Sequence, residues 1–249
     1  MGVWRSLGTR DASLRELMDD PACDTATLAR TYEQFRLVNG VVSGAGSVYR
    51  RWIRPRLSPV WTTRLLDVGT GGADLPRRWL RRAAAEGLRL EVTAIDPDPR
   101  ALTAASAALE RDPVPGLELS AATTSELARA DRHFDLVMSN HVLHHLDGRE
   151  FGALLADSER LAELGGTVVH GDIERSRLAY AAFAAGTWPF AANLLSGSFI
   201  RADGLASIRR SHTAPELEAA LPPGWRVRRA APSRLEVVWQ ADAAGRARG

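Results

Sequence analysis

The sequence predicts an α/β fold in which a mostly parallel sheet of seven strands is covered by helices on both faces. Apolar runs of strand length alternate with helical patterns through most of the chain, which is typical of a doubly wound parallel sheet. Gly69 and Gly71 follow the first run and let the chain turn sharply from a strand into a helix. Residues 231–233 are too short a connection for a parallel crossover, so the last strand is predicted to be antiparallel.

The individual strands are predicted from apolar runs bounded by turn-forming residues. Between the first two, a helix is expected to begin near Pro76, to place Trp79 and Leu80 on its apolar side, and to stop at Gly87. The seven strands are expected near residues 64–69, 90–95, 117–120, 134–138, 166–171, 225–230 and 234–239.

The regions outside these strands predict the domain organisation. Residues 1–58 contain a helical pattern and are expected to form an N-terminal helical cap. Residues 59–240 are expected to form the core, with a lid at about residues 175–212, because that connection is long and rich in aromatic residues. The same aromatic spacing also fits ordinary core packing. Residues 241–249 are expected to form a flexible tail.

Composition limits the compartment and the possible partners. The chain has 249 residues, of which 45% are apolar and 25% charged, and it contains no apolar run long enough to cross a bilayer. Its start lacks the apolar segment of a secretory signal, so we expect a cytoplasmic protein that does not bind membranes. Cys23 is the only cysteine, which excludes an intramolecular disulfide and a thiolate metal cluster.

Lysine is absent, because every one of the 32 basic residues is arginine. This excludes a Walker A loop, a pyridoxal-phosphate Schiff base and a Tyr-x-x-x-Lys dehydrogenase site, each of which requires a lysine. Arginine in place of lysine is typical of a GC-rich bacterium. The net charge is only +2 and the arginines are dispersed among acidic residues, so no nucleic-acid partner is expected.

The glycine turn and an acidic residue downstream predict a nucleoside site. Glycines at 69 and 71 leave backbone N–H groups open to a ligand, because no Cβ atoms cover them. Asp96 closes the next apolar run, where a carboxylate in such folds accepts hydrogen bonds from ribose hydroxyls. Asp96 and Pro97 also fit a simpler role, as residues that end a strand and lead into a helix.

The residues around these glycines distinguish between cofactors. The dinucleotide fingerprint needs a third small residue where this chain has Asp74, which disfavours NAD and FAD. Asp67 precedes the first glycine and gives the order Asp-x-Gly-x-Gly-x-small. With this motif the chain resembles the class I S-adenosylmethionine-dependent methyltransferases, which have a Rossmann-like fold with a reversed last strand. The resemblance covers residues 64–172 and departs at Ala73, where a third glycine is usual.

The resemblance implies S-adenosylmethionine as the cofactor and a set of residues that bind it. Thr123 stands where relatives usually place an aspartate that accepts a hydrogen bond from the adenine amino group, and its hydroxyl is a weaker acceptor than a carboxylate. The cofactor-binding residues are expected to be Asp67, Gly69, Thr70, Gly71, Asp96, Pro97, Thr123, Asn140 and His141.

Polar residues just beyond the fourth and fifth strands predict the reacting centre. Asn140 and His141 end the fourth run, His144 and His145 follow on the next turn, and Asp172 ends the fifth. The carboxyl ends of parallel strands form the ligand-binding edge of such sheets. A histidine beside a carboxylate suits proton removal from a hydroxyl, because its pKa lies near neutrality.

The Leu-His-His segment at residues 143–145 and the aspartate after the fifth strand, Asp172, resemble those of bacterial small-molecule O-methyltransferases that act on natural products. The resemblance implies His144 as the base, supported by His145 and Asp172, although one histidine of this segment is a packed structural residue in some relatives. No further ligand stands at a recognisable spacing from these histidines, so the sequence predicts no metal site.

We therefore expect methyl transfer from S-adenosylmethionine to a small apolar or aromatic acceptor, with a phenolic hydroxyl of a polyketide or quinone-like metabolite as the preferred target. Carbon methylation of an activated aromatic ring and a catalytically inactive cofactor-binding partner protein are the alternatives. A homodimer is a further expectation.

Overall fold

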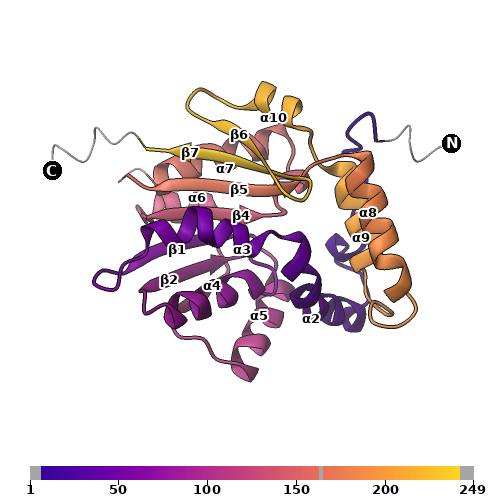
Figure 1. Cartoon of the computed structure of the whole chain (residues 1–249), viewed down its shortest axis with the longest axis horizontal. Coiled ribbons are helices and arrows are strands. Elements are labelled where there is room, and N and C mark those ends of the chain that lie inside the picture. Colours follow the sequence, from indigo (N-terminus) through magenta and orange to yellow (C-terminus); the bar gives the residue numbers. More distant parts are fainter. Residues whose placement is uncertain (1–6, 163–164, 242–249) are drawn as a thin grey trace.

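The computed structural model describes residues 7–162 and 165–241, with the side chains of residues 36–42 outside that description. The predicted tail therefore lies outside the described residues except for Ala241. The centre of the molecule is a seven-stranded sheet in the order β3-β2-β1-β4-β5-β7-β6 (Figure 1). Its strands are β1 (Thr63–Val68), β2 (Leu90–Ile95), β3 (Leu117–Ser120), β4 (Leu136–Asn140), β5 (Thr167–Ile173), β6 (Arg226–Ala230) and β7 (Arg234–Gln240).

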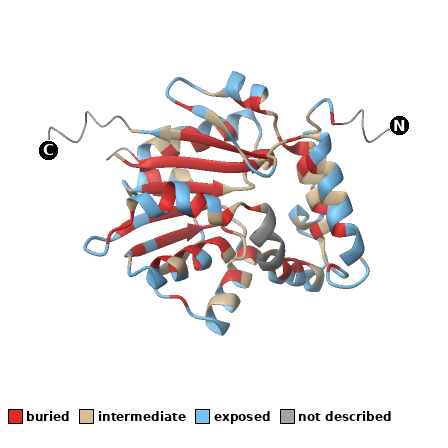
Figure 2. Ribbon diagram, viewed as in Figure 1, coloured by how far each residue is buried: buried red, intermediate tan, exposed pale blue. Residues whose placement is uncertain are grey.

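Pairing of the strands confirms the predicted mixed sheet. Strands β1 to β5 run parallel to one another, whereas β7 runs antiparallel to both β5 and β6. Residues 231–233 form the short connection between β6 and β7, and β7 then inserts between β5 and β6. The central strands are buried along most of their length, because helices cover both faces (Figure 2).

One face of the sheet is covered by α4 (Asp74–Ala85) and by the segment before β1. That segment holds α3 (Ala45–Val48), a π-helical turn at Tyr49–Ile53 and a 3-10 turn at Arg54–Arg56. Tyr49, Trp52 and Ile53 are buried in one cluster with Trp79 of α4 and with apolar residues of β1 and β2. Part of the region predicted as a cap thus packs directly on the core.

The opposite face is covered by α6 (Thr124–Arg129), α7 (Gly148–Leu161) and α10 (Ala214–Ala220), whose apolar residues share a second cluster with β4, β5 and β7. The start of α7 is fixed by a capping box, in which Asp147 accepts N–H groups of the first turn and Glu150 accepts the Asp147 N–H. The helix α5 (Pro99–Arg111) is capped by Asp98, the residue before it, whose carboxylate accepts the Arg100 N–H at 2.8 Å.

A third group of elements lies beyond the carboxyl ends of the strands. It contains α2 (Thr25–Val42), α8 (Arg177–Thr187) and α9 (Ile200–Arg210), which stand together to the right of the sheet in Figure 1. The short turns of this region are Leu17–Asp19, Leu143–His145 and Trp188–Phe190. None of the described helices combines the length and apolar composition needed to cross a membrane.

Candidate active site

A cavity of about 420 Å³ opens between the carboxyl ends of the strands and the helices α2, α8 and α9. Sequence reasoning had placed the ligand-binding residues at this edge of the sheet. Asp172 and Thr123 do not line the cavity, whereas ten other predicted residues do. These ten are Asp67, Gly69, Thr70, Gly71, Asp96, Pro97, Asn140, His141, His144 and His145.

The glycine turn forms one wall of the cavity. Gly69 and Gly71 have φ angles of +68° and +54°, which a residue with a Cβ rarely adopts. A Cβ on Gly69 would lie only 2.6 Å from Cγ2 of Val142, so the turn also depends on close contact with the segment after β4. Ala73 has φ +53°, and this left-handed backbone explains why related motifs place a glycine at the same position.

Asp96 holds the turn from the neighbouring strand. Its carboxylate accepts the Gly71 N–H at 2.8 Å and the Asp98 N–H at 3.0 Å. Burial raises the pKa of Asp96, while these two backbone hydrogen bonds lower it. Asp96 therefore fixes the backbone beside the cavity and still presents a carboxylate to it.

Asp67 lines the same cavity, and the residue is only 3% exposed. Burial, and then the nearby carboxylates of Asp74 and Asp96, raise the pKa of Asp67 to about 7. This end of the cavity is thus acidic in composition, and its Asp67 carboxyl group titrates near neutral pH.

The Thr123 side chain has a structural contact instead of a place in the cavity. Its hydroxyl accepts the Glu126 N–H, and the Glu126 carboxylate accepts the Thr123 N–H at 2.8 Å, which closes a capping box at the start of α6. An N-cap geometry occupies the hydroxyl that was predicted to meet adenine. The pattern Thr-x-x-Glu at residues 123–126 is the sequence signal for this contact.

His144 is buried between two carboxylates. Its Nδ1 lies 2.8 Å from Oδ1 of Asp172, and its Nε2 lies 3.2 Å from Oε1 of Glu16. Burial alone would lower the pKa of His144, but Asp172 and Glu16 outweigh burial and raise the pKa to about 9. His144 also holds Asp172 through its backbone N–H at 2.9 Å. The contact with Asp172 is the one that the sequence predicts for a histidine base, whereas Glu16 faces the second ring nitrogen, which the prediction left open for the acceptor.

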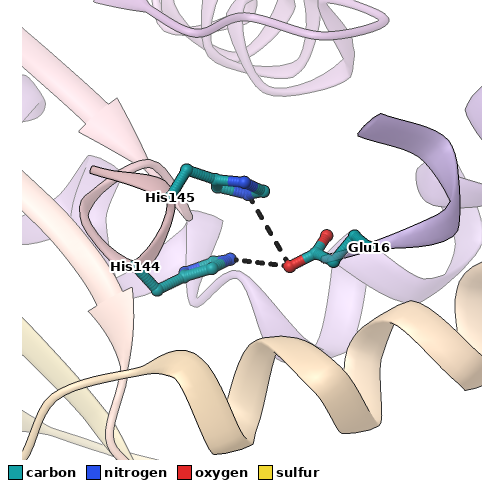
Figure 3. A group of neighbouring side chains, drawn as sticks. All are labelled: Glu16, His144 and His145. Carbon is teal, nitrogen blue, oxygen red and sulfur yellow. Dashed lines mark hydrogen bonds and ion pairs between the residues drawn. The ribbon is translucent and has the colours of Figure 1, made fainter. Parts of the chain in front are cut away.

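His145 is the more open of the two histidines, with 30% of its side chain exposed. Its Nδ1 lies 3.2 Å from Oδ2 of Asp19, and its Nε2 lies 3.7 Å from Oε1 of Glu16. Glu16, His144 and His145, here termed the His–Glu cluster, meet at one carboxylate oxygen (Figure 3).

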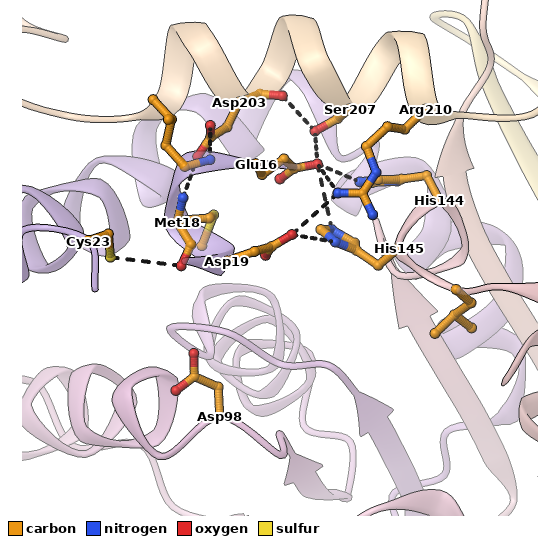
Figure 4. Close-up of polar contacts among 12 residues, drawn as sticks. Glu16, Met18, Asp19, Cys23, Asp98, His144, His145, Asp203, Ser207 and Arg210 are labelled. Atoms are coloured by element: carbon orange, nitrogen blue, oxygen red, sulfur yellow. Dashed lines mark hydrogen bonds and ion pairs between the residues drawn. The ribbon is translucent and has the colours of Figure 1, made fainter. Parts of the chain in front are cut away.

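Glu16 and Asp19 were not identified from the sequence as site residues. They belong to residues 7–20, here termed the N-terminal strap. The strap packs on α9 and on residues 143–146, here termed the histidine turn. The strap is held by Asp203 of α9, which accepts the N–H groups of Leu17 at 2.7 Å and Met18 at 3.1 Å (Figure 4). Glu16 also accepts a hydrogen bond from Ser207 at 2.7 Å.

Arg10 of the strap also holds the histidine turn, through the backbone carbonyl groups of that turn. Arg10 donates through Nη2 to the carbonyl oxygens of His144 and Leu146, each at 3.1 Å, and through Nε to that of Arg210 at 2.7 Å. No local pattern marks Arg10 or Glu16, because their partners lie more than a hundred residues away in the chain.

Asn140 and His141 are held from behind by a buried arginine of β7. Arg234 donates to the Asn140 side-chain oxygen, and its Nη1 lies 3.2 Å from Nε2 of His141. Burial, and secondarily the charge of Arg234, lower the pKa of His141, whereas Asp172 opposes this shift. His141 is therefore a neutral side chain with a fixed orientation at the cavity wall.

The side of the cavity away from the glycines is largely apolar. Phe183 of α8, Ile200 of α9 and Ile173 at the end of β5 line it. Tyr32 of α2 lies beside Gly71 and Gly72, and Phe35 of the same helix also lines the cavity. The predicted lid region and the helix α2 therefore supply apolar walls to the same space that contains the His–Glu cluster.

Comparison with known proteins identifies the domain. Residues 66–188 match the protein family described as a methyltransferase domain. The plantazolicin methyltransferase BpumL in complex with SAH superposes with a TM-score of 0.62 at 10% identity, covering 96% of this chain and 99% of that one. An O-methyltransferase family protein from Burkholderia thailandensis gives 0.61 at 17% identity, covering 96% and 68%. A SAM-dependent methyltransferase from Aquifex aeolicus gives 0.55 at 14% identity, covering 88% and 99%.

No curated protein sequence matches the chain. The solved structures share its fold at low identity, and the family match spans the glycine turn, Asp96 and the histidine turn. The predicted order Asp-x-Gly-x-Gly-x-small and the reversed last strand agree with this match. Residues 66–188 therefore form a methyltransferase domain, and the chain shares its fold with S-adenosylmethionine-dependent methyltransferases.

Proposed function

We propose that this enzyme methylates a hydroxyl group of a small, largely apolar acceptor, most simply the phenolic oxygen of a polyketide or quinone-like metabolite. The observation that carries the proposal is one cavity with two different ends. The glycine turn and Asp96 line one end, while the other combines apolar lid residues with the His–Glu cluster. A hydroxyl on an otherwise apolar molecule is complementary to such a wall.

The acidic end of the cavity suits the cofactor. S-Adenosylmethionine carries a sulfonium and an ammonium group, and when bound it supplies an electrophilic methyl group. Gly69 and Gly71 line the cavity, and the Asp96 carboxylate offers acceptors to ribose hydroxyls. The N–H groups of the two glycines already donate to the Ile95 carbonyl and to Asp96, so they are not open to a ligand as the sequence predicts. Asp67 provides a further carboxyl group there. We assign Thr123 to the helix cap and leave it out of this set.

The polar wall at the acceptor end orients the hydroxyl. In this proposal the hydroxyl proton passes to water and not to His144, because both ring nitrogens of His144 already face carboxylates. His144 instead positions Glu16 and Asp172, while Glu16 and the more exposed His145 face the acceptor. Positioning of the acceptor beside the methyl group supplies a large part of the rate acceleration.

The test is a two-step assay with purified protein. Isothermal titration should show micromolar binding of S-adenosylmethionine and S-adenosylhomocysteine, with NAD as the negative control. Substituted phenols and naphthoquinols are then incubated with methyl-labelled cofactor, and label on oxygen supports the proposal. Turnover that requires a free phenolic hydroxyl and disappears with its methyl ether would separate oxygen from carbon acceptors.

Carbon methylation is the second candidate, favoured by the engagement of both His144 nitrogens, because an activated ring needs less help from a base. Label on ring carbon would establish it. Cofactor binding without turnover on any acceptor would instead indicate an inactive partner protein.

The cellular location and the oligomeric state of the enzyme also belong to this proposal. The arginine-only basic residues and the single cysteine support a bacterial, cytoplasmic enzyme of natural-product biosynthesis. A homodimer is also proposed, and light scattering of the purified chain would test it.

A further inference from the structure

The His–Glu cluster has features that proton transfer alone does not require. His144 and His145 are consecutive residues of one tight turn, yet both direct Nε2 toward the same Glu16 oxygen, at 3.2 Å and 3.7 Å (Figure 3). The three ligand atoms all lie within 4.8 Å of one another. In a tetrahedral zinc site with bonds of about 2.0 to 2.1 Å, neighbouring ligand atoms lie about 3.3 Å apart.

The outer ring nitrogens of both histidines are also held by carboxylates. Nδ1 of His144 lies 2.8 Å from Oδ1 of Asp172. Nδ1 of His145 lies 3.2 Å from Oδ2 of Asp19 (Figure 4). A carboxylate behind a histidine fixes its tautomer, so that Nε2 presents its lone pair to an ion. Two such arrangements on adjacent residues leave both Nε2 atoms available for one ion.

From this geometry we infer that Nε2 of His144, Nε2 of His145 and Oε1 of Glu16 bind one divalent transition-metal ion, with Zn²⁺ as the best match to two imidazoles and a carboxylate. The proposed site departs from the prediction of no metal site, in which Glu16 had no part because it lies 128 residues from His144.

The charges around the cluster favour a cation. Glu16, Asp19 and Asp172 surround the histidines, and Arg210 lies 3.9 Å from Glu16 and 3.3 Å from Asp19. An ion bound to the two Nε2 atoms displaces any proton on them, and the three carboxylates and Arg210 then carry two negative charges together. A divalent ion balances them, which removes a cost of burying unpaired charge.

The ion would face the cavity, since all three ligands line it. Three protein ligands leave a position for water or for an acceptor oxygen, as in catalytic zinc sites. A hydroxyl that coordinates there has a lowered pKa, and its proton passes to water. This role in activating the acceptor rests on the proposed function, whereas the metal site itself does not.

The site is tested by direct metal binding. The full chain is stripped with a chelator and titrated with Co²⁺, whose visible absorption reports tetrahedral nitrogen and oxygen ligands, and then with Zn²⁺ in competition. We expect one ion per chain, and Glu16→Gln and His145→Asn should each lower the affinity about 100-fold or more. His133→Asn removes an imidazole that does not line the cavity and should leave the affinity unchanged.

Lack of saturable Co²⁺ and Zn²⁺ binding by the wild-type chain, or equal binding by both ligand variants, would overturn the inference. Should the variants not fold, anomalous diffraction at the zinc edge from wild-type crystals locates the ion, and a peak away from the cluster would also overturn it. Titration of the stripped protein with S-adenosylmethionine keeps the two proposals apart. Cofactor binding without metal binding removes only the metal site, and metal binding without cofactor binding removes only the proposed function.

Discussion

Single residues at this site combine structural and ligand-binding contacts. Asp96 is the clearest case, because its carboxylate accepts the Gly71 N–H and is also the residue predicted to meet ribose. Asp67 and Glu16 are likewise buried carboxyl groups that line the cavity. Their substitution is therefore expected to alter ligand affinity and the stability of the fold together.

Asp96→Ala should weaken S-adenosylmethionine binding about 10- to 100-fold, because charge-assisted hydrogen bonds to the ribose are lost. Isothermal titration measures this change. Glu91→Ala, on the exposed side of the same strand, is the matched control and should bind normally. Equal affinity of the Asp96 variant and the wild type would contradict the placement of the cofactor.

The pH dependence of stability should report Asp67. The pKa of this carboxyl group is raised from its ordinary 3.8 to about 7 in the folded chain, so the folded state binds the proton more tightly than the unfolded state. Its contribution to the free energy of unfolding is therefore full below about pH 4 and is lost as the pH rises through about 7. Asp67→Asn should flatten this part of the curve in urea denaturation. Parallel curves for both proteins would show that Asp67 titrates normally.

At the scale of elements, the glycine turn depends on the segment that follows β4. Gly69→Ala should destabilise the fold by about 2 kcal/mol or more, because it adds a left-handed backbone cost and a contact of 2.6 Å with Val142. Gly152→Ala in α7 is the matched control, since a Cβ there meets no atom within 4 Å, and it should stabilise by about 0.5 to 1 kcal/mol. Thermal unfolding compares the two variants. A Gly69 variant as stable as the wild type would contradict the prediction that this turn cannot accommodate a Cβ.

Strands were the elements that the sequence predicted best. β2 and β3 match the predicted residues, and β1, β6 and β7 agree within about a residue at each end. β4 begins two residues later than expected, at Leu136, because Phe134 is buried in the helix-covered cluster without pairing in the sheet. Apolar runs report burial, and burial extends beyond the strand ends.

The site was only partly predictable for a different reason. Residues on the strand ends could be placed, because the topology of a parallel sheet brings those ends together. The partners of His144 could not, because Glu16 and Arg10 reach it across long sequence separations without any periodic pattern. Thr123 does not line the cavity because its hydroxyl caps α6, as the local motif Thr-x-x-Glu would have predicted.

On the scale of the whole molecule, the N-terminal strap joins the sheet to α9. Arg10 donates to carbonyl oxygens of the histidine turn and of Arg210, so it ties two distant regions together. Arg10→Ala should lower the free energy of unfolding by about 2 kcal/mol, because the buried carbonyl groups lose charged partners. Exposed Arg15→Ala is the control and should change little in the same urea titration. Equal losses for both variants would indicate a general effect of charge.

The strand order has a consequence for how the chain is made. β6 is synthesised before β7, yet β7 lies between β5 and β6 and, among the residues that the structure describes, is the only strand that pairs with β6. Until β7 leaves the ribosome, β6 has no neighbour and the edge of β5 stays open to other chains. We therefore expect nascent chains arrested before residue 234 to aggregate or to recruit chaperones, whereas chains extended past Gln240 complete the sheet.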